Sequence, residues 1–236
     1  MGTIWWINPV GTAVFDQEVS DAIAAVCAPH HHAIVRHLDR GPVHLEYRSY
    51  GQQVITPVIE LAREAEAAGA YAVVVGCFFD VGVRDLRECV RLPVVGMGEA
   101  SMLLASTLGH RFSVVVGRRK WIAQVEENAL LAGMERHLVS VPAVGMSIPE
   151  AQADPAAFFD RVREAARLAV ERDGAEVIVL SEIAPPGFAR QLRSELGVAF
   201  VDPGMASWKW AEMMADLYEQ EAVSHAEIGA YEPPPP

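Results

Sequence analysis

One cysteine follows a strand-like segment at a position where a side chain can do chemistry. The segment VVVGCFFD, residues 73–80, runs from an apolar strand pattern into Gly76 and Cys77. Backbone N–H groups in this loop and the start of the next helix are expected to lower the thiol pKa from about 8.5 toward neutrality. Cys77 is then a candidate general base for a carbon acid. The alternative is a small buried hydrophobic residue, the usual fate of a cysteine outside disulfides.

A second segment repeats this pattern with a carboxylate in place of the thiol. Residues 69–101 align with residues 174–207, and within this alignment Cys77 falls on Glu182. Apolar neighbours are expected to raise the pKa of Glu182 by desolvation, toward the range in which a carboxyl group exchanges protons at neutral pH. Glu182 is therefore the second candidate acid/base residue. The alternative is a strand-end glutamate in solvent or paired with an arginine.

Further candidate substrate-binding residues follow other strand-like segments. Asn8 offers an amide to a substrate carboxylate or carbonyl, or simply begins an Asn-Pro turn. The backbone N–H groups of Phe78 and Phe79 are candidate donors to an enolate oxygen, while their rings line either the pocket or the core. A basic cluster beginning at Arg118 either favours an anionic substrate or forms a solvated loop. The predicted substrate-binding set is Asn8, Phe78, Phe79, Gly117, Arg118, Ile183 and Ala184.

The sequence indicates neither a metal site nor a cofactor site. His30, His31 and His32 are consecutive in a segment predicted as a surface turn before a strand. Successive side chains of a loop do not converge on one ion, and no carboxylate or thiol stands at ligand spacing. The glycines after the strands make no phosphate-binding fingerprint. Cys27 and Cys89 are expected to be packing residues, so we expect no cofactor and no metal.

Eight strand-like segments are spread along the chain. They are rich in β-branched residues and cover residues 3–8, 33–38, 71–76, 93–97, 112–117, 137–144, 176–181 and 198–202. Helical patterns lie between them. Apolar strands that alternate with helices predict parallel sheets covered on both faces. The internal repeat further predicts an α/β fold of two pseudo-twofold-related lobes, with Cys77 and Glu182 in the cleft between them at the carboxyl ends of the strands.

Several helix boundaries are marked by single residues. One helical segment runs from Pro57 to Gly69, and Gly109 ends another. Both glycines are expected in the left-handed conformation that commonly follows a helix. Asp154, which precedes a proline, is predicted to cap the next helix with its side chain.

Composition narrows the class of protein. The 236 residues carry a formal net charge of −12, which argues against a nucleic-acid surface. The hydrophobic fraction of 51% and charged fraction of 21% fit a globular protein. No segment approaches the roughly 20 apolar residues of a membrane span, and the start lacks the pattern of a signal peptide. Together with three unpaired-looking cysteines, this predicts a cytoplasmic protein with no membrane partner.

Six motifs in order resemble the aspartate/glutamate/hydantoin racemase superfamily, and most closely its hydantoin racemase branch. They are INPVGT (7–12), RGPVHLE (40–46), GCFFDVGVRDLRE (76–88), LPVVGMGEAS (92–101), RFSVVVG (111–117) and VDPGMAS (201–207). The resemblance implies two Rossmann-like lobes, each with a catalytic cysteine in the interlobe cleft. Cys77 matches the first cysteine, and Glu182 stands in place of the second.

The resemblance also suggests the domain limits and the activity. Lobe one is expected at 1–97 plus 205–225, lobe two at 98–204, and a flexible proline-rich tail at 226–236. The leading hypothesis is a cofactor-independent racemase or epimerase, with Cys77 and Glu182 as the acid/base pair, in a homo-oligomer acting on a small substrate. The alternatives are a decarboxylase or C–C lyase similar to arylmalonate decarboxylase, which uses a single thiol, and a non-enzymatic protein that binds small anions.

Overall fold

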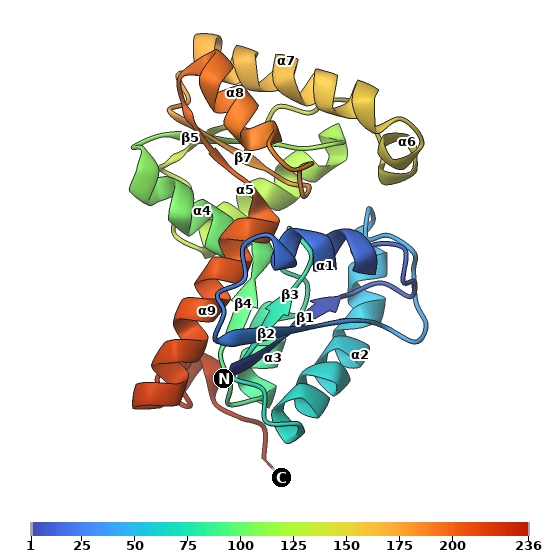
Figure 1. Cartoon of the computed structure of the whole chain (residues 1–236), viewed down its shortest axis with the longest axis vertical. Coiled ribbons are helices and arrows are strands. Elements are labelled where there is room, and N and C mark those ends of the chain that lie inside the picture. The colour runs from blue at the N-terminus through green and yellow to red at the C-terminus, as the bar shows by residue number, and fades with distance from the viewer. Residues whose placement is uncertain (1, 236) are drawn as a thin grey trace. The chain divides into compact units, whose positions relative to one another are not determined.

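The computed structural model describes residues 2–235 and divides into two compact units. One unit comprises Met1–Met97 and Ser207–Pro236, and the other comprises Gly98–Ala206. The chain leaves the first unit at the start of helix α4 (Met97–Leu108) and returns within helix α9 (Pro203–Glu221). Each unit is a sheet flanked by helices (Figure 1).

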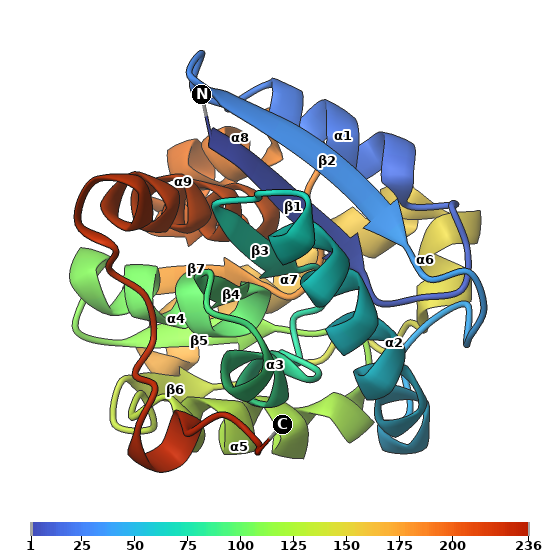
Figure 2. The same cartoon turned by 90° about the horizontal axis from the view of Figure 1, so that it is seen from below.

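The first unit contains a four-stranded parallel sheet with the order β2-β1-β3-β4 (Figure 2). Its strands are β1 (Gly2–Asn8), β2 (His31–His37), β3 (Ala72–Val75) and β4 (Val94–Gly96). Its helices are α1 (Asp16–Ala24), α2 (Arg48–Ala67) and α3 (Val83–Cys89), joined by the later part of α9 and the 3-10 turn η2 (Gly229–Tyr231).

The second unit repeats this order as β6-β5-β7-β8, again entirely parallel. Its strands are β5 (Phe112–Val115), β6 (Leu138–Ser140), β7 (Val177–Leu180) and β8 (Ala199–Val201). Its further helices are η1 (Arg119–Trp121), α5 (Ile122–Leu131), α6 (Ile148–Ala153), α7 (Pro155–Asp173) and α8 (Phe188–Leu196). Each of the eight predicted strand-like segments overlaps one strand, although β1 and β2 begin before their predicted segments. The predicted α/β fold of two helix-flanked parallel sheets is confirmed.

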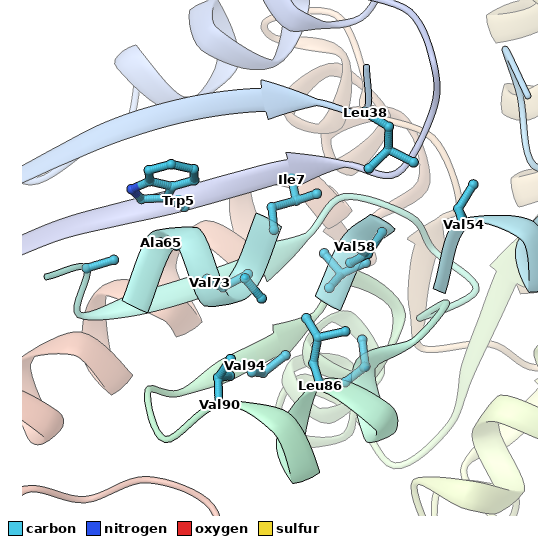
Figure 3. Packing of buried hydrophobic residues seen from close by; sticks show 14 of the residues in the cluster. Trp5, Ile7, Leu38, Val54, Val58, Ala65, Val73, Leu86, Val90 and Val94 are labelled. Atoms are coloured by element: carbon cyan, nitrogen blue, oxygen red, sulfur yellow. The ribbon is translucent and has the colours of Figure 1, made fainter. Parts of the chain in front are cut away.

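The central strands are buried on both faces, as their unbroken apolar sequences require. Every residue of β3 is fully buried, and one face of its sheet packs against α2 and α3 (Figure 3). Val73 on β3, Val58 on α2 and Leu86 on α3 belong to this cluster. In the second unit, α7 and α8 pack in the same way on one face of β5, β7 and β8. Both sheets are therefore rigid supports for the loops that follow their strands.

Two predicted helix boundaries are wrong in part. Helix α2 begins at Arg48, so Pro57 lies inside it and does not start it. The buried stripe that includes Gly51 and Val54 continues through Val58, and this burial outweighs the roughly 3 kcal/mol cost of an internal proline. Gly109 does follow a helix, but without a positive φ angle; a Cβ there would lie 2.8 Å from the Val177 side chain.

The prediction of a surface turn at the histidine run is wrong for two of its three residues. His31 and His32 open strand β2, because β1 begins at Gly2 and pairs with His31 from its first residue. His31 is buried, whereas His32 on the same strand is exposed. Only His30 lies in the turn.

The segment predicted as a tail makes contacts with the first unit. Tyr231 lies in η2, and its hydroxyl accepts a hydrogen bond from Arg87 at 3.3 Å. The guanidinium of Arg87 also lies over the Tyr231 ring, 5.7 Å from its centroid. Pro236 lies outside the described residues. Among the helices of residues 2–235, none has both the length and the apolar character that crossing a bilayer demands.

Candidate active site

A chain of hydrogen bonds fixes Asn8 at the carboxyl end of β1. The Trp6 indole Nε1 donates to Asn8 Oδ1 at 2.8 Å, and Asn8 Nδ2 donates to Asp16 Oδ1 at 2.6 Å. Asp16 Oδ2 lies 2.7 Å from His37 Nδ1. The donor on one side and the carboxylate on the other settle which way the amide points. Asn8 is thus a rigidly held amide, 3% exposed, that belongs to a network and not only to a turn.

Close packing positions the loop that carries Cys77. A Cβ on Gly76 would lie 2.2 Å from Trp6 Nε1, so the indole that orients Asn8 requires a glycine immediately before the cysteine. After Gly76 the chain turns tightly, with the Asp80 N–H donating to the Cys77 carbonyl at 3.0 Å. Cys77 is half-buried at the edge of the core cluster, and Phe78 behind it is 4% exposed. Asn8 ends β1 and Cys77 follows the neighbouring strand β3, so both lie at the carboxyl-end edge of their sheet.

Glu182 occupies the equivalent position in the second unit. Strand β3 pairs with β1 up to Val75, and strand β7 pairs with β5 up to Leu180. Cys77 comes two residues after Val75, and Glu182 comes two residues after Leu180. Since the two sheets have the same strand order, the thiol and the carboxylate stand at matching points of the two units. The distance between them stays a prediction.

Asp202, a residue outside the set predicted from the sequence, holds the loop after Glu182. Its Oδ2 accepts the Ala184 N–H at 2.8 Å, and its Oδ1 accepts the Met205 N–H at 2.9 Å in the first turn of α9. Burial raises the pKa of the Asp202 carboxyl, against the opposing effect of backbone N–H groups from Met205, Ala184 and Gly204. One side chain therefore caps α9 and fixes the loop. The Asp-Pro dipeptide, which also marks Asp154 as an N-cap, was the available signal.

Three polar groups beside the candidate acid/base residues have no hydrogen-bond partner within residues 2–235. The hydroxyl of Ser181, a residue that is 5% exposed and directly precedes Glu182, is one of them. The backbone N–H groups of Phe78 and Ile183 are the other two. Each of these N–H groups belongs to the residue that follows Cys77 or Glu182. Backbone donors so placed suit a developing negative charge on a substrate oxygen.

The predicted basic cluster lies at the end of β5, and its residues differ in burial. Gly117 is buried, and a Cβ there would lie 2.6 Å from the Met146 carbonyl oxygen. Arg118 is half-buried, while Arg119 and Lys120 are exposed. The positive charge of Arg118 contributes to lowering the pKa of the Glu150 carboxyl, after hydrogen bonds from Ser147. Arg118 therefore already has an acidic neighbour in the second unit.

Comparison with known proteins identifies the family. The Asp/Glu/Hydantoin racemase family matches residues 4–209. The chain belongs to this family. A hydantoin racemase from Pseudomonas sp. (strain NS671) is 32% identical over 212 residues, covering 89% of this chain and 85% of that protein. This confirms the family predicted from the six motifs.

Solved structures of other proteins share this fold. Allantoin racemase from Pseudomonas fluorescens matches with a TM-score of 0.87 and 27% identity, covering 99% of this chain and 97% of that chain. Unliganded arylmalonate decarboxylase matches with a TM-score of 0.63 and 22% identity, covering 91% and 93%. The decarboxylase shows a shared fold alone. The racemase relatives support an isomerase, as predicted.

Proposed function

We propose that this member of the racemase family is a cofactor-independent racemase or epimerase, with Cys77 and Glu182 as its acid/base pair. The observation that carries the proposal is their equivalence: each comes two residues after the matching strand of its own parallel sheet. A racemase needs one proton-transferring group for each face of the reacting carbon. The repeated unit supplies two such groups, one after the equivalent strand of each sheet.

The substrate is proposed to be a hydantoin-like ring or a related small amino-acid derivative. Two relatives bear the names hydantoin racemase and allantoin racemase. Both names describe rings in which a carbon next to a carbonyl carries the stereochemistry. The rigid amide of Asn8 suits hydrogen bonding to such a ring, and Arg118 suits an anionic form of it.

In the proposed reaction the Cys77 thiolate takes the proton from the carbon next to the carbonyl. The C–H electron pair forms a double bond to the carbonyl carbon, and the π pair of the carbonyl moves onto its oxygen as negative charge. The Glu182 carboxyl then gives a proton to the opposite face of the carbon, and the roles exchange for the other enantiomer. Carbon acids of this kind are weak, so the enolate requires several kcal/mol of stabilisation. The Phe78 and Ile183 N–H groups and Asn8 are the proposed donors.

Two variants test the proposal on racemic and enantiopure 5-substituted hydantoins and allantoin in deuterated water. Cys77→Ser should abolish nearly all turnover, because serine is a far weaker acid and base than a thiol at neutral pH. Glu182→Gln keeps the shape but cannot exchange a proton, so it should stop racemisation while one enantiomer still exchanges deuterium through Cys77. Chiral chromatography and mass spectrometry measure both. Full two-sided racemisation by Glu182→Gln would remove Glu182 from the pair.

A crystal structure with a bound hydantoin tests the same proposal geometrically. Proton transfer to each face takes roughly 3 Å, so Cys77 Sγ and a Glu182 carboxyl oxygen should be about 7 Å apart across the substrate. A structure of the complex with one of the two residues far from the reacting carbon contradicts the proposal.

A decarboxylase is the second candidate, because the proposed pair contains a single thiol. The shared fold with arylmalonate decarboxylase is compatible with it. A lyase that uses only Cys77 should lose less than about tenfold in kcat/KM in Glu182→Gln, equivalent to about 1.4 kcal/mol. It should also release carbon dioxide from an α-aryl malonate, whereas a racemase exchanges the proton of recovered substrate.

A cytoplasmic location and a homo-oligomeric state complete the proposal. All three cysteines lie within the described residues and outside disulfides, which fits a reducing compartment. Size-exclusion chromatography with light scattering measures the oligomeric state directly.

A further inference from the structure

We propose that His30, His31 and Asp216 form a binding site for a divalent transition metal such as Zn²⁺. His31 opens β2 and His30 directly precedes it, while Asp216 comes from the C-terminal half of α9, which lies beside the starts of β1 and β2 (Figure 1). All three belong to the first unit. The proposed racemase chemistry does not use this cluster.

The distances in the cluster suit a common metal ion. Asp216 Oδ1 lies 3.3 Å from His30 Nε2 and 3.2 Å from His31 Nε2. The ligand atoms of all three residues lie within 4.8 Å of one another. Tetrahedral Zn²⁺ with bonds of about 2.0–2.1 Å to nitrogen and oxygen sets its ligand atoms about 3.3 Å apart. Both histidine–aspartate distances therefore match the distance between two ligand atoms of a tetrahedral zinc site before any metal is bound.

His31 supplies the observation that points to a ligand. Its side chain is 1% exposed, yet neither ring nitrogen makes a hydrogen bond with any residue in 2–235. The Nε2–Oδ1 distance of 3.2 Å is short, but the two groups are not aligned for a hydrogen bond. A buried polar atom without a partner costs roughly 1–3 kcal/mol, which coordination of Nε2 to a metal would offset. The ring packs closely against Gly2, where an added Cβ would lie 3.1 Å from His31 Nδ1.

A second set of contacts holds the histidine segment against α9. Glu212, one turn before Asp216 on α9, accepts the Ala28 N–H at 2.6 Å. Its carboxylate is itself held by Trp208 Nε1 at 2.8 Å and by Lys209 Nζ at 2.7 Å. The segment is also tied to β1, because the Gly2 N–H donates to the His30 carbonyl at 3.1 Å. The three ligand groups are thus brought together by the fold and need little reorganisation to bind an ion.

The donor set determines the class of ion. Two imidazoles and one carboxylate suit Zn²⁺, Co²⁺ or Ni²⁺ better than Mg²⁺ or Ca²⁺, which prefer oxygen ligands. Three protein ligands leave a fourth position for water, and His30 is 58% exposed toward solvent. A bound ion would join the start of β2 to α9.

This site is separate from the candidate active site. Strands β1 and β2 pair Gly2 with His31 at one end and Asn8 with His37 at the other. Six residues of strand separate these ends by about 20 Å. The expected effect of the metal is therefore on the stability of the first unit and not on proton transfer.

Tag-free protein, stripped with chelator and dialysed, provides the test. Isothermal titration with Zn²⁺ should show one site per chain, and Co²⁺ should develop the strong visible absorption typical of tetrahedral coordination. His30→Gln and Asp216→Asn alter exposed or half-exposed side chains, so both should fold. Each should weaken binding by about tenfold or more, since even changes around metal ligands have effects of that size. Circular dichroism confirms folding.

His32→Gln is the matched control, because His32 is adjacent to His31 but exposed on the other side of β2. It should bind Zn²⁺ like the parent protein. Asp216→Asn preserves the shape and a hydrogen-bonding oxygen, so a loss of binding there reflects the metal ligand. The proposal is overturned if the parent protein binds no Zn²⁺ at millimolar concentration. It is equally overturned if His30→Gln and Asp216→Asn bind as tightly as His32→Gln.

Discussion

Replacing Asp202 by alanine removes two hydrogen bonds, one to a helix start and one to a loop. Asp202 caps the first turn of α9 through Met205 N–H and holds the loop after Glu182 through Ala184 N–H. Loss of an aspartate cap costs about 1 kcal/mol. The unpaired Ala184 N–H adds about 1–3 kcal/mol. Because burial of the carboxylate is itself unfavourable, as its raised pKa indicates, we expect a total near the low end, about 2 kcal/mol.

Asp154→Ala is the matched control for this prediction. Asp154 also precedes a proline and caps a helix, accepting the Ala157 N–H at 3.0 Å, but its cap is exposed and holds no second loop. Asp154→Ala should lose about 1 kcal/mol of unfolding free energy and keep its kcat/KM. Asp202→Ala should lose about twice as much, with kcat/KM falling because the Glu182 loop is released.

Urea denaturation followed by circular dichroism measures the first quantity, and the racemisation assay measures the second. Equal losses of unfolding free energy in the two variants would falsify the role given to the Ala184 hydrogen bond. Unchanged kcat/KM in Asp202→Ala would separate this loop from catalysis.

Three further predictions concern pH, reactivity and packing. Burial raises the pKa of Asp202 in the folded protein above its unfolded value of about 3.9. The stabilising contribution of Asp202 is therefore complete below that pH and declines as pH rises through the folded pKa. Urea denaturation should show that Asp202→Ala loses more unfolding free energy at pH 4 than at pH 7. Iodoacetamide should label Cys77 before Cys27, whose thiol pKa is raised by burial and by a nearby carboxylate; equal rates in mass spectrometry contradict the reactivity proposed for Cys77. Gly76→Ala places a methyl group against the Trp6 indole, so it should lower the unfolding free energy by about 1–3 kcal/mol and also lower the activity. Unchanged stability and activity would show that the loop accommodates the methyl group by a small shift.

Local sequence patterns determined the secondary structure and much of the fold. Unbroken apolar segments rich in β-branched residues, such as that of β3, are typical of strands buried on both faces, and their alternation with helices predicts parallel sheets. The Asp154 cap was predicted correctly, because the aspartate side chain accepts a hydrogen bond from a backbone N–H only three residues further along the chain. The repeat and the motifs further indicated two similar units and the family.

Contacts between distant parts of the chain could not be predicted in this way. No local signal links Trp6 and Asn8 to Asp16 and His37, since that network forms only when β1, α1 and β2 pack together. The proline inside α2 was placed wrongly because its cost is local while the burial that overrides it is tertiary.

The histidine run shows most clearly the difference between local patterns and long-range contacts. From the sequence alone, three adjacent histidines lacked any carboxylate at ligand spacing. The fold brings Asp216 of α9 within 3.2 Å of His31, whose ring is buried. Spacing along the chain governs groups within one turn or strand, whereas side chains far apart in sequence meet only where packed elements bring them together.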